Sequence, residues 1–226
     1  MTVAAATRNS VNVAFITMAQ KLDVCDIRDT AKSYGVHRAD GKELGAEPAA
    51  IIGTNEIAPL TMAAAIATVG ANGLYCVPTI IDRVSAPDGK DLPGQPRSCS
   101  QAIAPNIAAT VAYALSAVMT AGTGTPGQPR DGVPIVGKTG TTDDSAQNWL
   151  VATTTKVSLA VWVGNTDGGH YSLRKTRLAG TNGYNTKFNI FRNTMASLNT
   201  NPEYRGGAFP APDPALVAGR GTARPK

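Results

Sequence analysis

The chain has 226 residues, of which 42% are hydrophobic, 16% charged and 5% aromatic, and its formal net charge is +5. This length suits one domain with a substantial core, and the composition is that of a globular protein rather than a disordered or collagen-like one. The basic residues are scattered without interleaved aromatics, which does not favour nucleic-acid binding, and no apolar run is long enough to span a bilayer.

Helices are predicted mainly in the first half of the chain, where apolar residues recur at helical spacing. They are expected over residues 13–24, 27–34, 60–71 and 106–121. Asp26 is expected to cap the second helix and Gly35 to end it. Pro59 and Pro105 fit the first turns of the two long helices, because proline needs no hydrogen-bond partner there. Residues 36–57 are expected to be mostly loop.

Strands are predicted mainly in the second half. One is expected over residues 78–86, leaving through a turn at residues 87–90. After the Gly- and Pro-rich segment 122–132, three short apolar runs follow. They span residues 133–140, 148–153 and 157–164. Because only a short polar turn separates the last two runs, they are predicted to form an antiparallel hairpin.

The end of the chain is predicted to contain a loop, a helix and a disordered tail. The loop covers residues 165–186, and the helix covers residues 186–198 with Phe188 and Phe191 on one side. From Asn201 the chain is rich in Pro, Ala and Gly, which predicts disorder. The expected organisation is therefore a folded unit over residues 1–200 and a tail over residues 201–226. The fold class is α/β (α+β), with an antiparallel sheet packed against helices.

Cysteine and histidine positions do not indicate a metal site. Cys25, Cys76 and Cys99 are far apart and form no C-x-x-C pair, so one bridge with one free thiol is left open. His37 and His170 form no H-x-x-x-H pair and are expected on the surface. We expect neither a metal nor a cofactor. The first ten residues, MTVAAATRNS, have no basic stretch followed by an apolar one, so no export signal is predicted.

Residues 132–139, GVPIVGKT, match two different motifs. As a phosphate-binding loop, the segment needs a buried strand before Gly132 and a helix that begins at Lys138-Thr139. The preceding residues, TPGQPRD, cannot form that strand, and Gly140 after the motif is a poor helix start. The context therefore disfavours a nucleotide site.

As K-T-G, the same residues lie on a strand beside an acylated serine. Strand alternation places Lys138 and Gly140 on one face and Thr139 and Thr141 on the other. A glycine on such a strand lets a ligand backbone lie close. Three common residues are weak evidence alone, but a Ser-x-Asn triplet, Ser10-Val11-Asn12, lies upstream and heads a predicted helix.

With these motifs in this order, followed by NWLVAT and VSLAVWVG, the chain resembles the transpeptidase domain of class A (bifunctional) penicillin-binding proteins of actinobacterial type. The resemblance runs from about Asn9 to about Leu198. It implies a beta-lactamase/transpeptidase-like fold and a place on the extracytoplasmic face of the plasma membrane, in the cell envelope. It also implies that peptidoglycan stem peptides ending in D-alanyl-D-alanine, and beta-lactams, are the partners.

The resemblance implies serine acyl transfer with a role for each motif residue. Ser10 would relay a proton, Asn12 would hold the substrate amide, and Lys138 would place positive charge near the substrate carboxylate. The hydroxyls of Thr139 and Thr141 would bond that carboxylate. The backbone N–H of Thr141 would be one of two oxyanion donors.

The chain departs from this family because no S-x-x-K nucleophile motif precedes Ser10. The match at Ser172–Lys175 follows K-T-G within a Gly- and Asn-rich loop, so we interpret it as accidental. The expectation is a C-terminal piece of the transpeptidase domain, without the N-terminal part of the fold and inactive alone. The alternatives are a remnant or regulatory fragment that binds stem peptide or a full-length partner, a carboxypeptidase or beta-lactamase, and the nucleotide binder.

A plainer interpretation of each motif residue also stays open. Ser10 and Asn12 could be a helix cap and its neighbour. Lys138 could be an exposed strand residue, with Thr139 and Thr141 as ordinary strand formers. Nearby Asp143 and Asp144 are expected to form a solvated turn rather than an acid pair.

Overall fold

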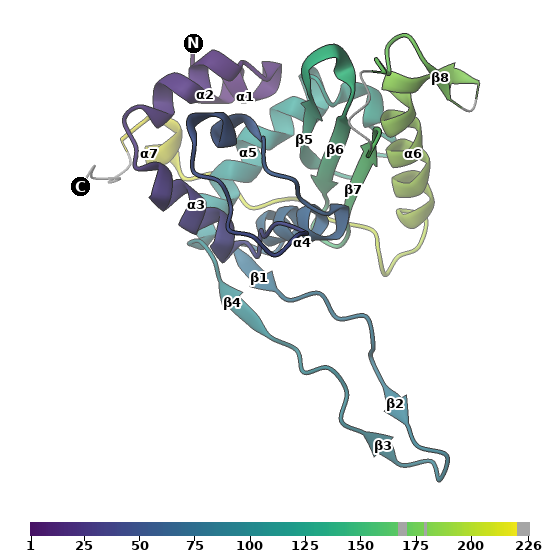
Figure 1. Cartoon of the computed structure of the whole chain (residues 1–226). Coiled ribbons are helices and arrows are strands. Elements are labelled where there is room, and N and C mark those ends of the chain that lie inside the picture. The colour runs from purple at the N-terminus through teal and green to yellow at the C-terminus, as the bar shows by residue number, and fades with distance from the viewer. Residues whose placement is uncertain (167–170, 179, 221–226) are drawn as a thin grey trace.

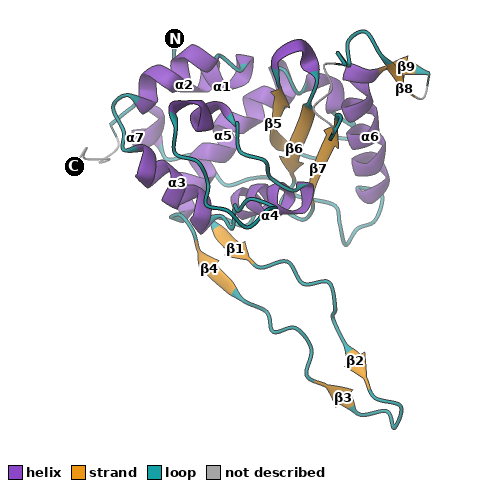
Figure 2. Cartoon of the chain, in the orientation of Figure 1, coloured by secondary structure: helices purple, strands orange, loops and turns teal. Residues whose placement is uncertain are grey.

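A three-stranded antiparallel sheet lies in the body of the molecule, with helices packed around it (Figure 1 and Figure 2). The structure is a computed structural model and describes residues 1–166, 171–178 and 180–220. The sheet consists of β5 (Val136–Thr141), β6 (Asn148–Thr153) and β7 (Ser158–Val163), in the order β5-β6-β7. The three predicted strands and the antiparallel hairpin of the last two are confirmed.

Helices make up much of the N-terminal half and recur near the end. Those before the sheet are α1 (Val3–Asn9), α2 (Asn12–Ala19), α3 (Val24–Ser33), the 3-10 helix η1 (Pro48–Ile52), α4 (Pro59–Gly70), α5 (Pro105–Ala121) and the 3-10 helix η2 (Thr125–Gly127). The later ones are the 3-10 helix η3 (Asp143–Ser145), α6 (Gly183–Leu198) and α7 (Pro214–Val217). The two long helices begin at Pro59 and Pro105 as predicted, because a missing N–H costs nothing in the first turn.

Two apolar clusters pack helices against the two faces of the sheet. On one face Val136 packs with Val69 of α4 and Ala112 of α5. On the other face β6, β7 and α6 contribute most of a larger buried cluster. Its members are Met119, Ile135, Leu150, Ala152, Val161, Phe188, Phe191 and Met195. The sheet is therefore enclosed between α4 and α5 on one side and α6 on the other.

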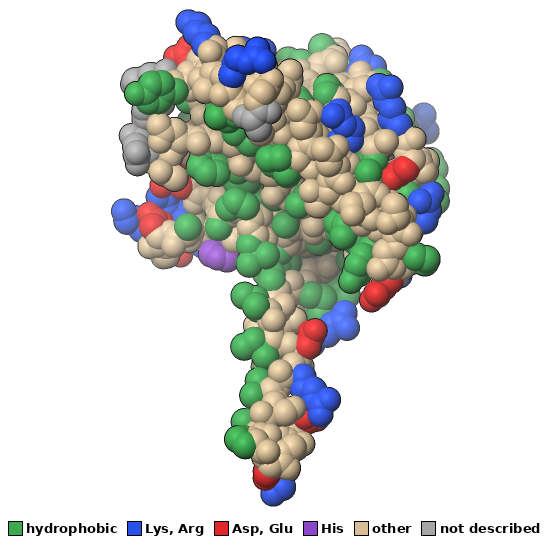
Figure 3. Space-filling view, turned by 90° about the vertical axis from the view of Figure 1, so that its right-hand side faces the viewer, with side chains coloured by type: hydrophobic (Ala, Val, Ile, Leu, Met, Phe, Trp, Pro, Cys, Tyr) green, Lys and Arg blue, Asp and Glu red, His purple; other side chains and the backbone are tan. Residues whose placement is uncertain are grey.

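An extended arm projects from the body between α4 and α5 (Figure 1 and Figure 3). At its base β1 (Leu74–Cys76) pairs with β4 (Cys99–Gln101), and towards its tip β2 (Val84–Ser85) pairs with β3 (Asp91–Leu92). The strand predicted over residues 78–86 is thus reduced to β2. Pro78, Pro93 and Pro96 lie between the two ladders, and proline cannot donate a ladder hydrogen bond.

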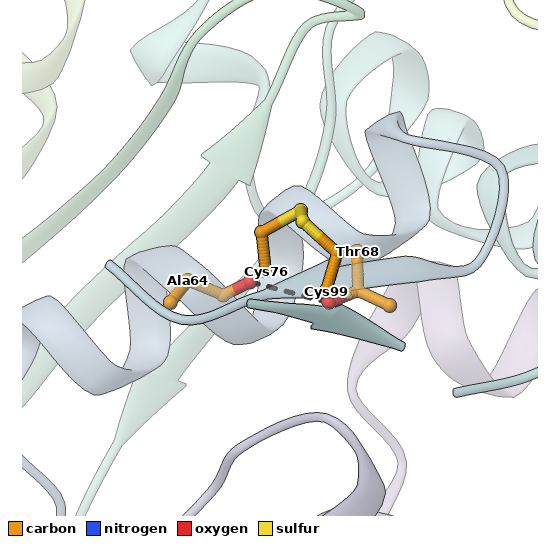
Figure 4. The surroundings of a disulfide bond; sticks show 4 residues. All are labelled: Ala64, Thr68, Cys76 and Cys99. Carbon is orange, nitrogen blue, oxygen red and sulfur yellow. Dashed lines mark hydrogen bonds between the residues drawn. A yellow bond between two sulfur atoms is a disulfide. The ribbon is translucent and has the colours of Figure 1, made fainter. Parts of the chain in front are cut away.

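A disulfide closes the base of this arm. Cys76 and Cys99 are directly paired in the β1–β4 register and are bonded to each other, beside α4 (Figure 4). Cys25 is free and exposed. The sequence left this pairing open, because nothing local shows that residues 23 positions apart lie opposite each other.

The predicted boundaries between α2 and α3 are wrong. α2 ends at Ala19 instead of continuing to residue 24, and α3 begins at Val24. Asp23, not Asp26, is the cap, because its carboxylate accepts a hydrogen bond from the N–H of Cys25 at 2.7 Å. Asp26 lies within the first turn, where a negative charge still favours the helix dipole. Gly35 follows the helix with a φ of +73°, as its predicted terminating role requires.

Part of the loop predicted over residues 165–186 forms regular structure. β8 (Arg177–Leu178) pairs with β9 (Thr181–Asn182) inside the predicted loop, whose residues 167–170 and 179 lie outside the described residues. α6 begins at Gly183 rather than at residue 186, because Asn182 caps it by accepting from the N–H of Tyr184. The earlier start adds a turn to the helix.

Residues 201–220 lie against the body, whereas the sequence predicted disorder from Asn201. Phe209 packs against the cluster around Val136, and Asp213 caps α7 while accepting a hydrogen bond from Asn106 of α5 at 2.8 Å. One aromatic and one capping carboxylate hold this Pro- and Ala-rich segment in place. Residues 221–226, at the end of the predicted tail, lie outside the described residues.

The described residues contain no helix that is long and apolar enough to cross a membrane. They also contain no group of three or more His, Cys, Asp or Glu side chains that could hold a metal ion. His37 is exposed, as predicted, while His170 lies outside the described residues.

Candidate active site

The two sequence motifs meet in space. Lys138 of β5 donates a hydrogen bond from its Nζ to the Oγ of Ser10 at 2.7 Å, although 128 residues separate them. The same Nζ donates to the carbonyl oxygen of Thr139 at 2.8 Å. Ser10 reaches this place because α1 packs against α5, which in turn packs against β5.

The backbone at Ser10 is held in an unusual conformation. Ser10 ends α1 with φ +56° and ψ +49°, in the left-handed region. A residue with a side chain pays roughly 1–2 kcal/mol there, and such strain gathers at functional sites. The alternative in which Ser10 caps α2 is wrong, because Val11 occupies the N-cap position and no side chain caps that helix.

Asn12 stands at the start of α2, two residues after Ser10, and its side chain is exposed. No hydrogen bond joins that side chain to any residue that the structure describes. Its amide thus keeps both a donor and an acceptor for a ligand. This is the capacity that holding a peptide group requires.

The side chain of Lys138 is partly buried, and no negative charge of a described residue neutralises its ammonium group. Burial lowers the pKa of its ammonium group to about 8. Its hydrogen-bond acceptors, a hydroxyl and a carbonyl, are neutral. No carboxylate of the described residues lies within 4 Å of its Nζ. The lysine therefore remains mostly protonated at neutral pH and presents a positive charge that an anion can satisfy.

Thr139 and Thr141 occupy the opposite face of β5 from Lys138, as strand alternation predicted. The buried Thr139 shares a 2.6 Å hydrogen bond with the hydroxyl of Thr123. Thr141 is exposed, and its hydroxyl donates to the Oδ1 of Asn148 at 3.2 Å. One threonine is thus tied into the structure, while the other stands at the surface.

β5 lies at the edge of its three-stranded sheet. The N–H of Thr142 donates to the carbonyl of Gln147 at 3.0 Å. Hydrogen-bonded and outward-pointing residues alternate along an antiparallel strand, so the N–H of Thr141 points away from β6. An edge strand with a free N–H can pair with an extended peptide or donate to an oxyanion.

Gly140 lies between these threonines and is paired with Trp149. A Cβ built on Gly140 would lie 3.2 Å from the Cβ of Trp149, which is closer than ordinary contact. The absence of a side chain therefore serves packing against Trp149. From the sequence, the expected reason for a glycine at residue 140 is the close approach of a ligand backbone.

Sequence reasoning missed Lys187, which is fully buried with 0% exposure. It lies on α6, and its Nζ donates to the Oδ1 of Asn148 at 2.8 Å and lies 3.5 Å from the Oγ1 of Thr141. A signal was present, because a helical spacing of three and four residues places Lys187 on the apolar face with Tyr184, Phe188 and Phe191. A lysine among those residues indicates a buried charge.

The S-x-x-K match at Ser172–Lys175 does not form a nucleophile and base pair. Lys175 is exposed, and the bond between the two residues is a backbone one, from the N–H of Lys175 to the carbonyl of Ser172 at 3.0 Å. Both residues border an open hollow of about 490 Å³ that Asp144, Ser145 and Arg174 also line. Asp143 and Asp144 are exposed, in agreement with a solvated turn.

The phosphate-loop interpretation of GVPIVGKT is excluded by the fold. Lys138 and Thr139 lie in the middle of β5, whereas a phosphate loop requires a helix to begin there. The strand continues to Thr141 and is followed by the short 3-10 helix η3. Among the residues that the structure describes, no helix begins at the motif to receive a phosphate.

Comparison with known proteins agrees with this geometry. The family model described as "Penicillin binding protein transpeptidase domain" matches residues 1–195. The chain belongs to this family. The predicted class A penicillin-binding transpeptidase domain, with its antiparallel sheet packed against helices, is therefore confirmed.

The chain spans about a fifth of the length of the curated relatives that it matches. It is 33% identical to penicillin-binding protein 1A of Clostridium acetobutylicum over 174 residues, which are 75% of this chain and 21% of the relative. It is 30% identical to penicillin-binding protein 1A of Mycolicibacterium smegmatis, over 74% of this chain and 23% of the relative. The solved structure of the penicillin-binding protein PonA1 from Mycobacterium tuberculosis matches with a TM-score of 0.78 and 25% identity, over 93% of this chain and 59% of that one.

Proposed function

We propose that this chain supplies the substrate-binding half of a peptidoglycan D,D-transpeptidase site. It would hold the D-alanyl-D-alanine end of a stem peptide, or a beta-lactam, along the free edge of β5. The observation that carries the proposal is the 2.7 Å contact between Lys138 and Ser10 beside that edge. The solved structure of PonA1 in complex with penicillin V, from a relative with the same fold, supports the class of ligand.

Each motif residue has a role in this proposal. Lys138 attracts the C-terminal carboxylate, and the exposed hydroxyl of Thr141 donates to it. The outward N–H of Thr141 stabilises the oxyanion that forms during acyl transfer, a type of contribution worth about 2.7–4 kcal/mol. Ser10, whose Oγ is held by Lys138, relays a proton during acyl transfer. Asn12 bonds the substrate amide.

Thr139 and Gly140 have supporting roles. The hydroxyl of Thr139, bonded to that of Thr123, anchors β5 beneath the bound carboxylate. Gly140 lets β5 pack closely against Trp149 of β6. Neither a metal nor an organic cofactor is needed for this acyl-transfer chemistry.

Acyl transfer also requires a serine nucleophile with its lysine base, and no S-x-x-K motif precedes Ser10 in these 226 residues. We therefore propose that this chain by itself binds the ligand but forms no acyl-enzyme. A location on the extracytoplasmic face of the plasma membrane fits the disulfide between Cys76 and Cys99, since disulfides persist in oxidising compartments.

Two measurements test the proposal. Titration of the 15N-labelled chain with N-acetyl-D-alanyl-D-alanine should shift the amide signals of β5, and the C-terminal amide of the same peptide should shift them far less. Incubation with a fluorescent penicillin and a denaturing gel should show no covalent band. Equal binding of acid and amide contradicts the carboxylate site, and a covalent band contradicts the inactivity of the chain alone.

A further inference from the structure

Lys187 is a buried cation without an acidic partner. Its side chain is 0% exposed, and no carboxylate among the described residues lies within 4 Å of its Nζ. Burial lowers its pKa, and the positive charges of Arg174 and Lys138 lower it further. Burying an unpaired charge costs free energy of folding, which points to a functional role for Lys187.

Hydrogen bonds connect the buried Lys187 to the exposed hydroxyl of Thr141. The Oδ1 of Asn148 accepts from Lys187 at 2.8 Å and from the hydroxyl of Thr141 at 3.2 Å. The Nδ2 of Asn148 donates to the carbonyl of Ser145 at 3.1 Å, which fixes the orientation of the amide. Asn148 is fully buried, whereas Thr141 is exposed at the end of β5.

This arrangement decides where the Thr141 hydroxyl can point. Without Lys187, the buried Oδ1 of Asn148 would depend on Thr141 as its donor, because an unsatisfied buried acceptor is costly. With Lys187 present, Asn148 keeps a donor when the Thr141 hydrogen turns away. The ammonium, 3.5 Å from the Oγ1 of Thr141, can then donate to that oxygen.

We propose that Lys187 is a positioning residue of the carboxylate site, which frees the Thr141 hydroxyl to donate to the C-terminal carboxylate of the ligand. This inference rests on the proposed function. It adds a residue that lies outside both sequence motifs and acts through Thr141 from the buried face of β5. A carboxylate is the required ligand group, because a neutral amide would not gain from the positive charge behind the hydroxyl.

Aromatic rings hold the ammonium in place. The Nζ of Lys187 lies 4.2 Å from the ring centre of Tyr184 and 4.9 Å from that of Phe188. Arg174 stacks on the same Tyr184 ring at 3.9 Å. Burial, followed by the charges of Arg174 and Lys138, lowers the pKa of Lys187 to about 8, so the group is still mostly charged at neutral pH.

The test is a double-mutant cycle on the whole chain. Binding of N-acetyl-D-alanyl-D-alanine and of its C-terminal amide is measured by NMR titration for the original chain, Lys187→Met, Thr141→Val and the double variant. Methionine keeps the length of lysine and suits the apolar surroundings, and circular dichroism and the amide spectrum verify the fold. Lys156→Met is the matched control, because it removes one positive charge at an exposed position in the turn before β7.

We expect Lys187→Met to weaken binding of the acid about tenfold, the size of one charge-assisted hydrogen bond, and to leave the weak binding of the amide unchanged. In the Thr141→Val background the same change should cost about twofold or less. Lys156→Met should bind as the original chain does.

Unchanged binding of the acid by a folded Lys187→Met contradicts the inference, as does a full tenfold loss in the Thr141→Val background. These outcomes differ from failure of the proposed function itself. In that case the original chain would not distinguish the acid from the amide, and the inference would be overturned with it.

Discussion

The side chains of Ser10 and Lys138 are joined by a 2.7 Å hydrogen bond from Nζ to Oγ. Ser10 lies in a strained turn between two helices, and Lys138 lies on the edge strand of the sheet. The contact connects the N-terminal helices to the sheet at the place where the proposed ligand binds. It therefore helps to position the site.

Ser10→Ala should lower the pKa of Lys138 below its value of about 8. The serine oxygen accepts from the charged ammonium, and a hydrogen bond to the charged form favours that form. Titration of the lysine side-chain Cε resonances by NMR measures the effect. Ser172→Ala, in the accidental S-x-x-K match, is the control and should leave that pKa unchanged. A higher pKa in Ser10→Ala would show that the serine does not stabilise the ammonium.

Stability should rise with pH between about 8 and 10 because of Lys187. Its folded pKa of about 8 lies below the ordinary lysine value of 10.5, so in this window the unfolded chain binds more protons than the folded one. Under these conditions raising the pH favours folding, by on the order of 3 kcal/mol for a shift of this size. Lys138 contributes in the same direction.

Urea unfolding at a series of pH values, compared between the original chain and Lys187→Met, isolates this contribution. The difference in unfolding free energy between the two proteins should be largest near pH 7 and should shrink towards pH 10. At pH 7 the methionine variant should be the more stable of the two, since removing a buried charge entirely is often stabilising. A pH-independent difference would show that Lys187 has an ordinary pKa.

Replacing Cys76 and Cys99 together by serine should destabilise the fold by about 3 kcal/mol, from the chain entropy of a loop of this length. The bridge closes a 23-residue separation at the base of the arm, and β1 packs on α4. Thermal unfolding under non-reducing conditions measures the change. Cys25→Ser is the matched control, because that thiol is free and exposed. Equal melting temperatures for the double variant and the control would show that the arm unfolds independently.

Gly137→Ala should disturb the pairing of β5 with β6. The added Cβ would clash with the Cβ of Ala152 and lie 2.7 Å from the carbonyl oxygen of Val151, so one of the strands must shift. Overpacking of this kind typically costs about 1–3 kcal/mol. Gly94→Ala in the arm is the control, because its nearest contact is 3.7 Å and ordinary. Urea unfolding should separate the two variants clearly, and equal stability would mean that β5 adapts without strain.

The sequence alone determined the strands, the long helices and the family. Three short apolar runs marked β5, β6 and β7, and Pro59 and Pro105 marked the starts of α4 and α5. These features follow from side-chain periodicity and local backbone chemistry, which act over a few residues. The predicted helix boundaries near Asp23 and Asn182 were wrong by a few residues, because several neighbouring polar residues can each serve as the cap.

Only the tertiary structure decided which distant residues meet. The contact of Ser10 with Lys138, the pairing of Cys76 with Cys99 and the position of Lys187 behind Thr141 all join segments far apart in the chain. No local pattern determines such contacts, because they depend on how α1, α5 and α6 pack around the sheet. Burial, which sets the charge state of both lysines, is likewise a product of that packing.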